Sequence, residues 1–246
     1  MVGAIIQARL SSSRLPNKVL KKLPFGSETS VIENVYQRVR SVKEINKTIV
    51  ATSDEVSDDP LVDYCMKKGI PVFRGPLNNV LERFYSCSKL NSFNSIVRIT
   101  GDCPAIDPQL ISLVINEFEN SNFDFVSSTI SRTYPYGQDL SVFSFSSLEK
   151  AYKNATLERD FEHVTSYFYK TKPVEFKNLF LEAPLKHRGN NIRVTLDTKE
   201  DYLCLCAVFD NLYKSNHFFG IEDILMLKEI KPWIFEINSS SIQNKL

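Results

Sequence analysis

Short apolar runs rich in β-branched residues alternate with helix-like patterns along the first half of the chain. Five of these runs predict strands, at residues 2–7, 48–52, 71–73, 95–100 and 124–127. Between the runs, apolar side chains recur every three to four residues, as they do from Val31 to Val39, and this spacing predicts helices. Strands that alternate with helices predict an α/β fold with a mostly parallel, doubly wound sheet. In such sheets, ligands bind beyond the carboxyl ends of the strands.

The pattern changes after about residue 130. Residues 134–145 alternate between apolar and polar, which predicts antiparallel strands or an excursion from the sheet. Further along, the pattern predicts strands at residues 174–182 and 191–196, and helices at residues 146–152, 157–169, 199–213 and 221–228. We expect this half to complete the sheet and cover the site, and residues 236–246 to be a frayed tail or a partner contact. No flexible linker interrupts residues 1–246, which predicts a single domain.

Composition and charge narrow the classes of protein. The 246 residues carry 30 Lys and Arg against 29 Asp and Glu, a net charge of +1 that provides no field for nucleic acid or an anionic membrane. With 43% hydrophobic and 24% charged residues, the chain is typical of globular proteins. It contains no apolar run of about 18 residues to span a membrane, and its N-terminus does not resemble a signal peptide. The five scattered cysteines, without a CxxC pair, favour reduced thiols in the cytoplasm over a zinc site.

A loop rich in cations and hydroxyls follows the first predicted strand. It contains Arg9, Arg14 and Lys18, together with serines at positions 11–13. Arginine binds phosphate oxygens as a rigid fork, lysine as a mobile point charge, and hydroxyls and loop amides as neutral donors. The set therefore suits a polyphosphate, although a solvated polar loop has a similar composition. The chain contains neither the GxxxxGK[ST] nor the GxGxxG phosphate-binding motif.

Two aspartates follow predicted strands. Asp102 comes one glycine after residues 95–100, and Asp197 follows residues 191–196 directly. A carboxylate at the end of a parallel strand points into the ligand crevice. Two such carboxylates facing a polyphosphate suit Mg²⁺, which takes one or two protein carboxylates together with phosphate oxygens and water. Alternatively, either aspartate caps a helix or stabilises a turn.

Six segments together resemble one family of enzymes. They are similar to the cytidylyltransferases, above all to the spore coat polysaccharide biosynthesis protein F-like branch, which is related to the CMP-KDO and acylneuraminate cytidylyltransferases. In chain order, the segments read IIQARLSSSRLPNKVL, GIPVFRGPLNNVLERFY, IVRITGDCPAIDP, YPYGQDLSVFSF, EHVTSYF and RVTLDTKEDY, and the resemblance covers about residues 2–210. It implies a GT-A-like nucleotidyltransferase fold, a nucleoside triphosphate (usually CTP), Mg²⁺ as cofactor and an activated sugar as product.

The resemblance also assigns roles to residues. It implies a nucleotide-binding half, residues 1–130, and an acceptor-binding and homodimerisation half, residues 131–235. Arg9, Lys18 and Asp102 would be catalytic, and Asp102 and Asp197 would hold Mg²⁺. The nucleotide would contact Gln7, Ala8, Arg9, Ser12, Arg14, Lys18, Arg74, Gly75 and Asp102, with residues 73–83 closing over it. The acceptor sugar would contact Tyr136, Gln138, Asp139 and His163.

Some positions leave more than one interpretation. Relatives often carry Gly, Asp, Glu and Arg where this chain has Asn17, Asn79, Ser141 and Phe161. Asp139 also fits turn stabilisation, and His163 also fits a structural role. Arg98 is polar within a predicted buried strand, so it needs a partner, either a core carboxylate or the nucleotide.

The implied reaction is an in-line attack by an acceptor oxygen on the α-phosphorus, with pyrophosphate as the leaving group. The oxygen would belong to a 2-keto-3-deoxy sugar acid or to a sugar phosphate used in surface polysaccharide biosynthesis. Asp197, Asp139 or a metal-held hydroxide would take the proton. One alternative is another enzyme of similar fold, either a nucleotidyltransferase that uses a different nucleotide with a sugar 1-phosphate or a glycosyltransferase. The chain lacks the DxD motif expected of the latter at this strand end. The other alternative is a non-catalytic nucleotide-binding protein.

Overall fold

The computed structural model describes residues 1–241, and a sheet forms its centre. The strands are β1 (Val2–Gln7), β2 (Lys47–Ser53), β3 (Val72–Gly75), β4 (Ser95–Thr100), β5 (Phe125–Ser127), β6 (Leu140–Ser144) and β7 (Asn178–Phe180). They form one seven-stranded sheet in the order β3-β2-β1-β4-β6-β5-β7. All neighbours pair in parallel except β6, which is antiparallel to both β4 and β5. The strands predicted in the first half and the mostly parallel sheet are therefore confirmed.

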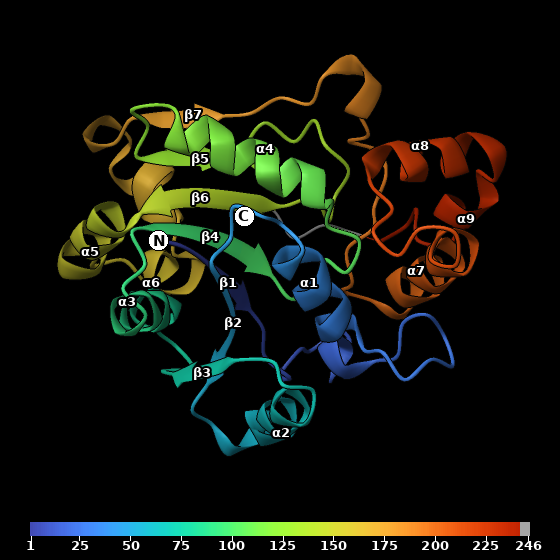
Figure 1. The fold of residues 1–246 in the computed structure, drawn as a ribbon, viewed down its shortest axis with the longest axis horizontal. Helices are drawn as coiled ribbons and strands as arrows, with labels where there is room; N and C mark the ends of the chain where they lie inside the picture. The colour runs from blue at the N-terminus through green and yellow to red at the C-terminus, as the bar shows by residue number, and fades with distance from the viewer. Residues whose placement is uncertain (242–246) are drawn as a thin grey trace.

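Helices cover both faces of the sheet (Figure 1). One face carries α1 (Val31–Arg40), α2 (Asp59–Lys67) and α4 (Pro108–Glu119), which share one hydrophobic cluster with the strands. The other carries α3 (Val80–Leu90), α5 (Phe145–Asn154) and α6 (Glu158–His163) around a second cluster. Because successive side chains of a strand point to opposite faces, Ile5 belongs to the second cluster and Ile6 to the first. Burial on both faces explains the continuous apolar runs in the sequence.

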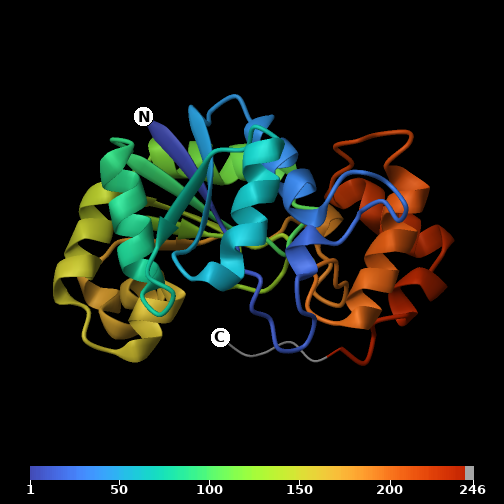
Figure 2. The ribbon, with the colours of Figure 1, turned by 90° about the horizontal axis from the view of Figure 1, so that it is seen from below.

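A third group of helices lies at one end of the molecule, on the opposite side from α5 and α6 (Figure 2). It comprises α7 (Lys199–Leu212), α8 (Ile221–Ile230) and α9 (Trp233–Glu236). Residues 192–196 run along this group, and the amide of Leu196 donates to the carbonyl of Asp102 at 2.9 Å. This contact brings the C-terminal part of the chain to the loop that follows β4.

The strand predicted at residues 191–196 is wrong. The segment forms only an isolated bridge between Tyr136 and Arg193. Its alternating apolar side chains are buried, but they pack into the core of the third helical group rather than against the sheet: Ile192, Val194 and Leu196. The alternation of apolar residues therefore predicted correctly that these side chains are buried. It predicted incorrectly that they pack in the sheet.

Two other elements of the second half are shorter than predicted. The strand predicted at residues 174–182 is reduced to β7, because Pro173–Glu175 form a 3₁₀ turn. The helix predicted at residues 157–169 ends at His163. There Val164 adopts a φ of 52°, a conformation that β-branched residues rarely take, and the chain continues as a π-helix over Tyr167–Thr171.

The predicted frayed tail is wrong as far as residue 241. Asn238 is only 3% exposed. Its side-chain amide donates to the carbonyl of Arg193 at 3.1 Å and to the carboxylate of Asp201 at 2.9 Å. Residues 242–246 of the predicted tail lie outside the described residues. Within residues 1–241, no helix combines the length and the apolar character needed to cross a membrane.

Candidate active site

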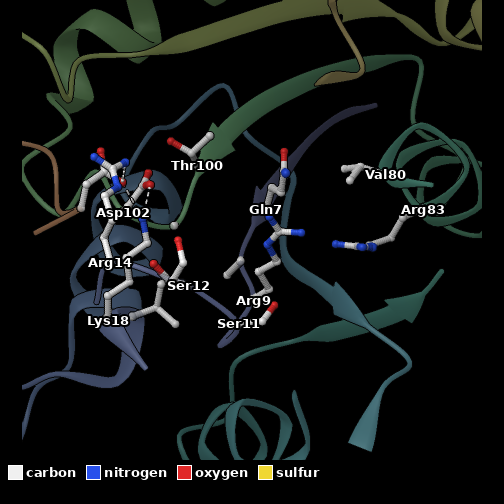
Figure 3. Close-up of a pocket in the computed structure, with 15 residues that line it drawn as sticks. Gln7, Arg9, Ser11, Ser12, Arg14, Lys18, Val80, Arg83, Thr100 and Asp102 are labelled. Carbon is white, nitrogen blue, oxygen red and sulfur yellow. Dashed lines mark hydrogen bonds and ion pairs between the residues drawn. The ribbon is translucent and has the colours of Figure 1, made fainter. Parts of the chain in front are cut away.

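A cavity of about 290 Å³ opens at the carboxyl ends of β1 and β4 (Figure 3). Because parallel strands end at the same edge of a sheet, the loops after these two strands meet there. The cavity is lined by Gln7, Ala8, Arg9, Ser11, Ser12, Ser13, Arg14, Lys18, Val19, Val80, Arg83, Thr100, Gly101, Asp102 and Asp197. The structure thus brings together the nucleotide and metal residues predicted from the sequence, except Arg74 and Gly75.

The loop after β1 is held at its base by a buried aspartate. Asp58 accepts hydrogen bonds from the amide of Leu10 at 2.7 Å and from the hydroxyl of Thr52 at 2.9 Å, rather than capping α2. Burial would raise the pKa of Asp58, but these hydrogen bonds and those from Ser53 hold the pKa below its usual value. A charged Asp58 therefore fixes the start of the loop that carries Arg9.

Lys18 joins two aspartates at one end of the cavity. Asn17 has a φ of 56°, which asparagine tolerates better than most residues, and this turn precedes Lys18. The Nζ atom of Lys18 lies 2.7 Å from Asp102 Oδ2 and 2.9 Å from Asp197 Oδ1. Burial alone would lower the pKa of Lys18, but the two carboxylates raise it. Arg14 lies 3.4 Å from Asp197 Oδ1, and we call Arg14, Lys18, Asp102 and Asp197 the paired end.

The paired end fits a divalent cation. Carboxylate oxygens from two separate segments converge on the single Nζ atom of Lys18, so a cation near that place would contact both. The second oxygen of Asp102 has only a weak contact, from the Cys103 thiol at 3.7 Å. Within residues 1–241, no three metal-binding side chains cluster together. Two carboxylates suit Mg²⁺ beside a polyphosphate, because Mg²⁺ takes its remaining ligands from phosphate and water.

Asp197 is oriented by a buried network that reaches the C-terminal segment. Arg193 donates to Asp197 Oδ2 at 2.7 Å and to both oxygens of Asp201 at 2.8 and 3.0 Å. The fully buried Asp201 also accepts from the amides of Asp197 and Thr198 and from Asn238. Although burial opposes it, these donors hold the pKa of Asp201 below its usual value. The network engages one oxygen of Asp197 and leaves the other toward Lys18.

Two arginines form the other end of the cavity, which we call the unpaired end. In Figure 3, Arg83 of α3 points toward Arg9. Neither arginine forms an ion pair within residues 1–241. Arg83 is 1% exposed, and within the part of the chain that the structure describes it donates only to the carbonyls of Pro76 at 2.7 Å and Leu77 at 3.1 Å. Burial lowers the pKa of Arg83, and the charge of Arg9 contributes in the same direction. A buried cation without a counter-ion, as Arg83 is, favours the binding of an anion, and the exposed Arg9 lines the same cavity.

Two arginines near β3 and α3 differ from the sequence prediction: Arg74 was predicted to contact the nucleotide and lies outside the cavity lining, whereas Arg83 lines it. Arg74 and Gly75 lie in β3, outside the cavity lining. Arg74 instead pairs with Asp59 at 2.6 Å and donates to the carbonyl of Ser53 at 3.0 Å. Arg83 was not singled out from the sequence as a site residue. A charged residue on the buried face of an amphipathic helix was the signal that could have found it.

Gln138, predicted to bind the acceptor, is turned into the protein interior. It is 1% exposed, its amide nitrogen donates to the carbonyl of Ala105 at 2.8 Å, and its oxygen accepts from the amide of Asp107 at 2.8 Å. Both polar atoms are therefore engaged in joining two loops, and the side chain does not reach the cavity.

The other three predicted acceptor residues, Tyr136, Asp139 and His163, lie outside the cavity lining and are half-buried. Asp139 pairs with Arg132 at 2.7 Å, and burial raises the pKa of Asp139. The guanidinium of Arg132 lies 5.2 Å from the centre of the Tyr136 ring. His163 ends α6, and burial lowers its pKa. Arg132 thus contacts both Asp139 and Tyr136, whereas His163 belongs to a separate element, α6.

Comparisons with known proteins identify the family. Residues 3–241 match the family described as cytidylyltransferase. The chain is 39% identical to an uncharacterized protein of Methanocaldococcus jannaschii, over 96% of this chain and 93% of that protein. It is 36% identical to the spore coat polysaccharide biosynthesis protein SpsF of Bacillus subtilis, over 83% and 85%.

A solved structure has the same fold. A cytidylyltransferase from Leptospira borgpetersenii serovar Hardjo-bovis superposes with a TM-score of 0.87 at 30% identity, covering 100% of this chain and 99% of that chain. This agreement confirms the predicted nucleotidyltransferase fold. Together with the cavity, it shows that the chain is a nucleotidyltransferase that belongs to the cytidylyltransferase family, in the branch that contains SpsF.

Proposed function

We propose that the protein transfers a cytidylyl group from CTP to an acidic sugar and releases pyrophosphate. The observation that carries this proposal is a single cavity with unpaired arginines at one end and two carboxylates that converge on Lys18 at the other. A magnesium nucleoside triphosphate complements both ends in charge. Membership of the family supports CTP as the donor, and the name of the relative SpsF supports a role in surface polysaccharide biosynthesis.

In this proposal, residues 8–18 and α3 bind the triphosphate. Arg9 and Arg83 supply charged donors, and the hydroxyls and amides of residues 11–13 supply neutral ones. Lys18 exchanges its carboxylate partners for phosphate oxygens. These cations stabilise the negative charge that grows on the pyrophosphate as it leaves.

Asp102 and Asp197 would hold Mg²⁺, which when bound polarises the phosphate oxygens and orients the triphosphate. The contribution of the chain is to place these two carboxylates in advance. Asp102 sits at the end of the buried strand β4, and Arg193 and Asp201 fix Asp197. Preorganised charges of this kind need no rearrangement during the reaction.

The acceptor would bind toward residues 131–235, the second half of the chain. Its oxygen attacks the α-phosphorus in line with the leaving pyrophosphate, and positioning supplies much of the rate. Asp139 is our candidate to take the proton, because burial raises its pKa and a carboxylate with a raised pKa is a better base. Tyr136 and His163 are candidate contacts for the sugar. We place the enzyme in the cytoplasm, since all five cysteines are free and buried. We also expect a homodimer, as the family resemblance implies, and light scattering tests it.

The experiment is a pyrophosphate-release assay with Mg²⁺. CTP, UTP, GTP and ATP are each tested with 2-keto-3-deoxy sugar acids and with sugar or polyol phosphates, and Asp102→Asn is the control. Release with CTP and one acceptor class, lost in the variant, supports the proposal. Release only with another nucleotide contradicts the cytidylyl assignment. No release from any pair contradicts the proposed reaction.

A further inference from the structure

A row of polar side chains crosses the sheet toward the cavity. Ser127 of β5, Ser141 of β6 and Arg98 of β4 are direct register partners. Arg98 also donates to the side chain of Gln7, which lines the cavity, at 3.1 Å. The parallel row two residues earlier along β4 is entirely apolar and comprises Phe125, Phe143 and Ile96. The core of this face thus becomes polar where the strands approach the cavity.

Arg98 carries a charge that no ion pair in residues 1–241 neutralises. Asp102 and Asp139 act on it only through space, and each is already paired, with Lys18 and Arg132 respectively, at 2.7 Å. Among residues 1–241, the Nε atom of Arg98 is buried without a hydrogen-bond partner, as are those of Arg38 and Arg83. The interpretation that a core carboxylate pairs with Arg98 is therefore wrong, and its guanidinium has unused capacity for an anion.

Arg38 shows how a structural buried arginine is held in this protein, although its Nε atom, like that of Arg98, has no hydrogen-bond partner among residues 1–241. It is 1% exposed and donates to the carbonyls of Ile106, His217 and Phe219 at 3.3, 3.1 and 2.7 Å. Its guanidinium also lies 4.2 Å from the centre of the Phe219 ring. Arg98 has instead one neutral side-chain partner and remains partly accessible. The difference lies in the other guanidinium contacts, since Arg38 has three carbonyl partners and a ring contact, whereas Arg98 has one side-chain partner among residues 1–241.

Two further polar groups lie near Arg98. His163 and Tyr169 come from α6 and from the π-helix that follows it, on the same face as Arg98. Burial lowers the pKa of His163 and raises that of Tyr169, and the charge of Arg98 acts on both. A neutral imidazole and a phenol add hydrogen-bonding capacity without adding a competing negative charge.

We propose that Arg98 forms an anion subsite for the acceptor and binds its acid group, a carboxylate or a phosphate, beside the cavity that holds the nucleotide. This inference rests on the proposed function, because it presumes an acceptor. It names Arg98 as the residue that selects an acidic acceptor.

Ser141 keeps this subsite available. Directly opposite residues in an antiparallel pair have Cβ atoms about 5 Å apart, so a glutamate at position 141 would reach Arg98 and pair with it. The buried serine is too short to do so, and its hydroxyl donates to Ser127 at 3.1 Å. Ser141→Glu therefore fills the subsite with an internal carboxylate, and Ser141→Gln adds the same bulk without the charge.

The test uses calorimetry on the full chain with the nucleotide cavity first saturated by CTP and Mg²⁺. Inorganic phosphate, pyruvate and neutral glycerol are then titrated separately, which distinguishes a phosphate from a carboxylate. We expect phosphate or pyruvate, but not glycerol, to bind the wild type. Arg98→Gln and Ser141→Glu should weaken that binding by about tenfold or more, as expected for the loss of a charge-assisted hydrogen bond. Ser141→Gln should stay within about threefold of the wild type.

The outcomes separate this subsite from the proposed function. Binding of CTP without any anion response, or equal losses in Ser141→Glu and Ser141→Gln, would overturn the subsite alone. Failure of the wild type to bind CTP would contradict the proposed function and the subsite with it. Thermal unfolding without ligands adds a second readout: a desolvated, unpaired cation destabilises the fold, so Arg98→Gln should unfold at the same temperature as the wild type or higher. A clearly lower temperature would show that Arg98 is structural.

Discussion

The two ends of the cavity differ in whether their charged side chains form ion pairs. At the paired end, Lys18 lies within 2.9 Å of two carboxylates, and Arg14 and Arg193 add further ion pairs to Asp197. At the unpaired end, Arg83 is buried and has only carbonyl partners among the described residues, with Arg9 nearby. Within residues 1–241, side chains neutralise the charges of the paired end and leave those of the unpaired end without a counter-ion.

This difference predicts separate tasks for the two ends. A satisfied, rigid cluster is suited to positioning a metal and the reacting phosphate, where small displacements reduce the rate. Unpaired cations are suited to binding the triphosphate itself, because the ligand supplies the missing counter-charge. Changes at the paired end should therefore act mainly on turnover, and changes at the unpaired end mainly on nucleotide affinity.

The largest effect is expected from Asp102→Asn at the paired end. The change removes one of two carboxylates that would hold Mg²⁺ and frees Lys18 from one partner. We expect kcat to fall by at least about a hundredfold, similar to the loss of one preorganised charge-stabilising group. CTP affinity without metal should stay within about threefold, because the unpaired end is intact. A variant that keeps kcat and loses only CTP affinity would reverse the assignment of the two ends.

A somewhat smaller effect is expected from Asp201→Asn, which acts on the paired end through Asp197. Arg193 then loses its ion pair with Asp201 and keeps the one with Asp197. We expect the free energy of unfolding at pH 7 to fall by about 2 kcal/mol, since a buried charge loses part of its compensation. The Mg²⁺ concentration for half-maximal rate should rise while CTP affinity without metal stays the same. An unchanged Mg²⁺ dependence would show that Asp201 supports the fold only.

Arg83→Gln tests the unpaired end. The buried guanidinium has no counter-ion within the described residues, so its removal should weaken CTP binding by about tenfold to a hundredfold and leave kcat at saturation nearly unchanged. Arg74→Gln is the matched control, because Arg74 pairs with Asp59 outside the cavity lining. Equal losses in both variants, measured by calorimetry with CTP, would contradict a specific role for Arg83.

The smallest effect concerns the acid stability that Asp201, which orients Asp197 of the paired end through Arg193, gives to the fold. Hydrogen bonds hold the pKa of Asp201 below its usual value despite burial. A carboxylate with a lowered folded-state pKa stabilises the fold above its unfolded pKa of about 4, and this contribution is lost as the pH falls through the folded-state value. The unfolding free energy of the wild type should therefore decline below about pH 4. Urea titrations should show a shallower decline in Asp201→Asn; identical slopes would contradict the charged state of Asp201.

The parts of the site that follow from local sequence could be predicted. The ends of parallel strands converge, so the positions of Arg9 and Asp102 followed from the runs that precede them. The prediction that Asp197 lines the cavity holds although residues 191–196 form no strand. The alternating apolar residues before Asp197 are buried whether they pack in a sheet or against helices. The roles of these residues stay predictions until they are tested by mutation.

The parts that depend on contacts between distant segments could not be predicted. Asn238 donates a hydrogen bond to Asp201, which is 37 residues earlier in the chain. No pattern in the sequence around either residue predicts that contact. Gln138 lies in a loop whose composition suits a ligand, but its side chain points into the interior and joins two other loops. The sequence indicated that Arg98 needs a partner, because it lies in a buried strand. It could not show that Ser141 lies opposite Arg98, because that depends on the register of β4 with β6.

The most direct test of this account is calorimetry of CTP binding with and without Mg²⁺. The account predicts that CTP binds the wild type without metal through the unpaired end. It also predicts that Mg²⁺ raises this affinity by at least about tenfold through Asp102 and Asp197. The gain should vanish in Asp102→Asn, whereas binding without metal should persist. An affinity that Mg²⁺ does not change, or a gain that survives in Asp102→Asn, would contradict the division of the cavity into a metal end and a triphosphate end.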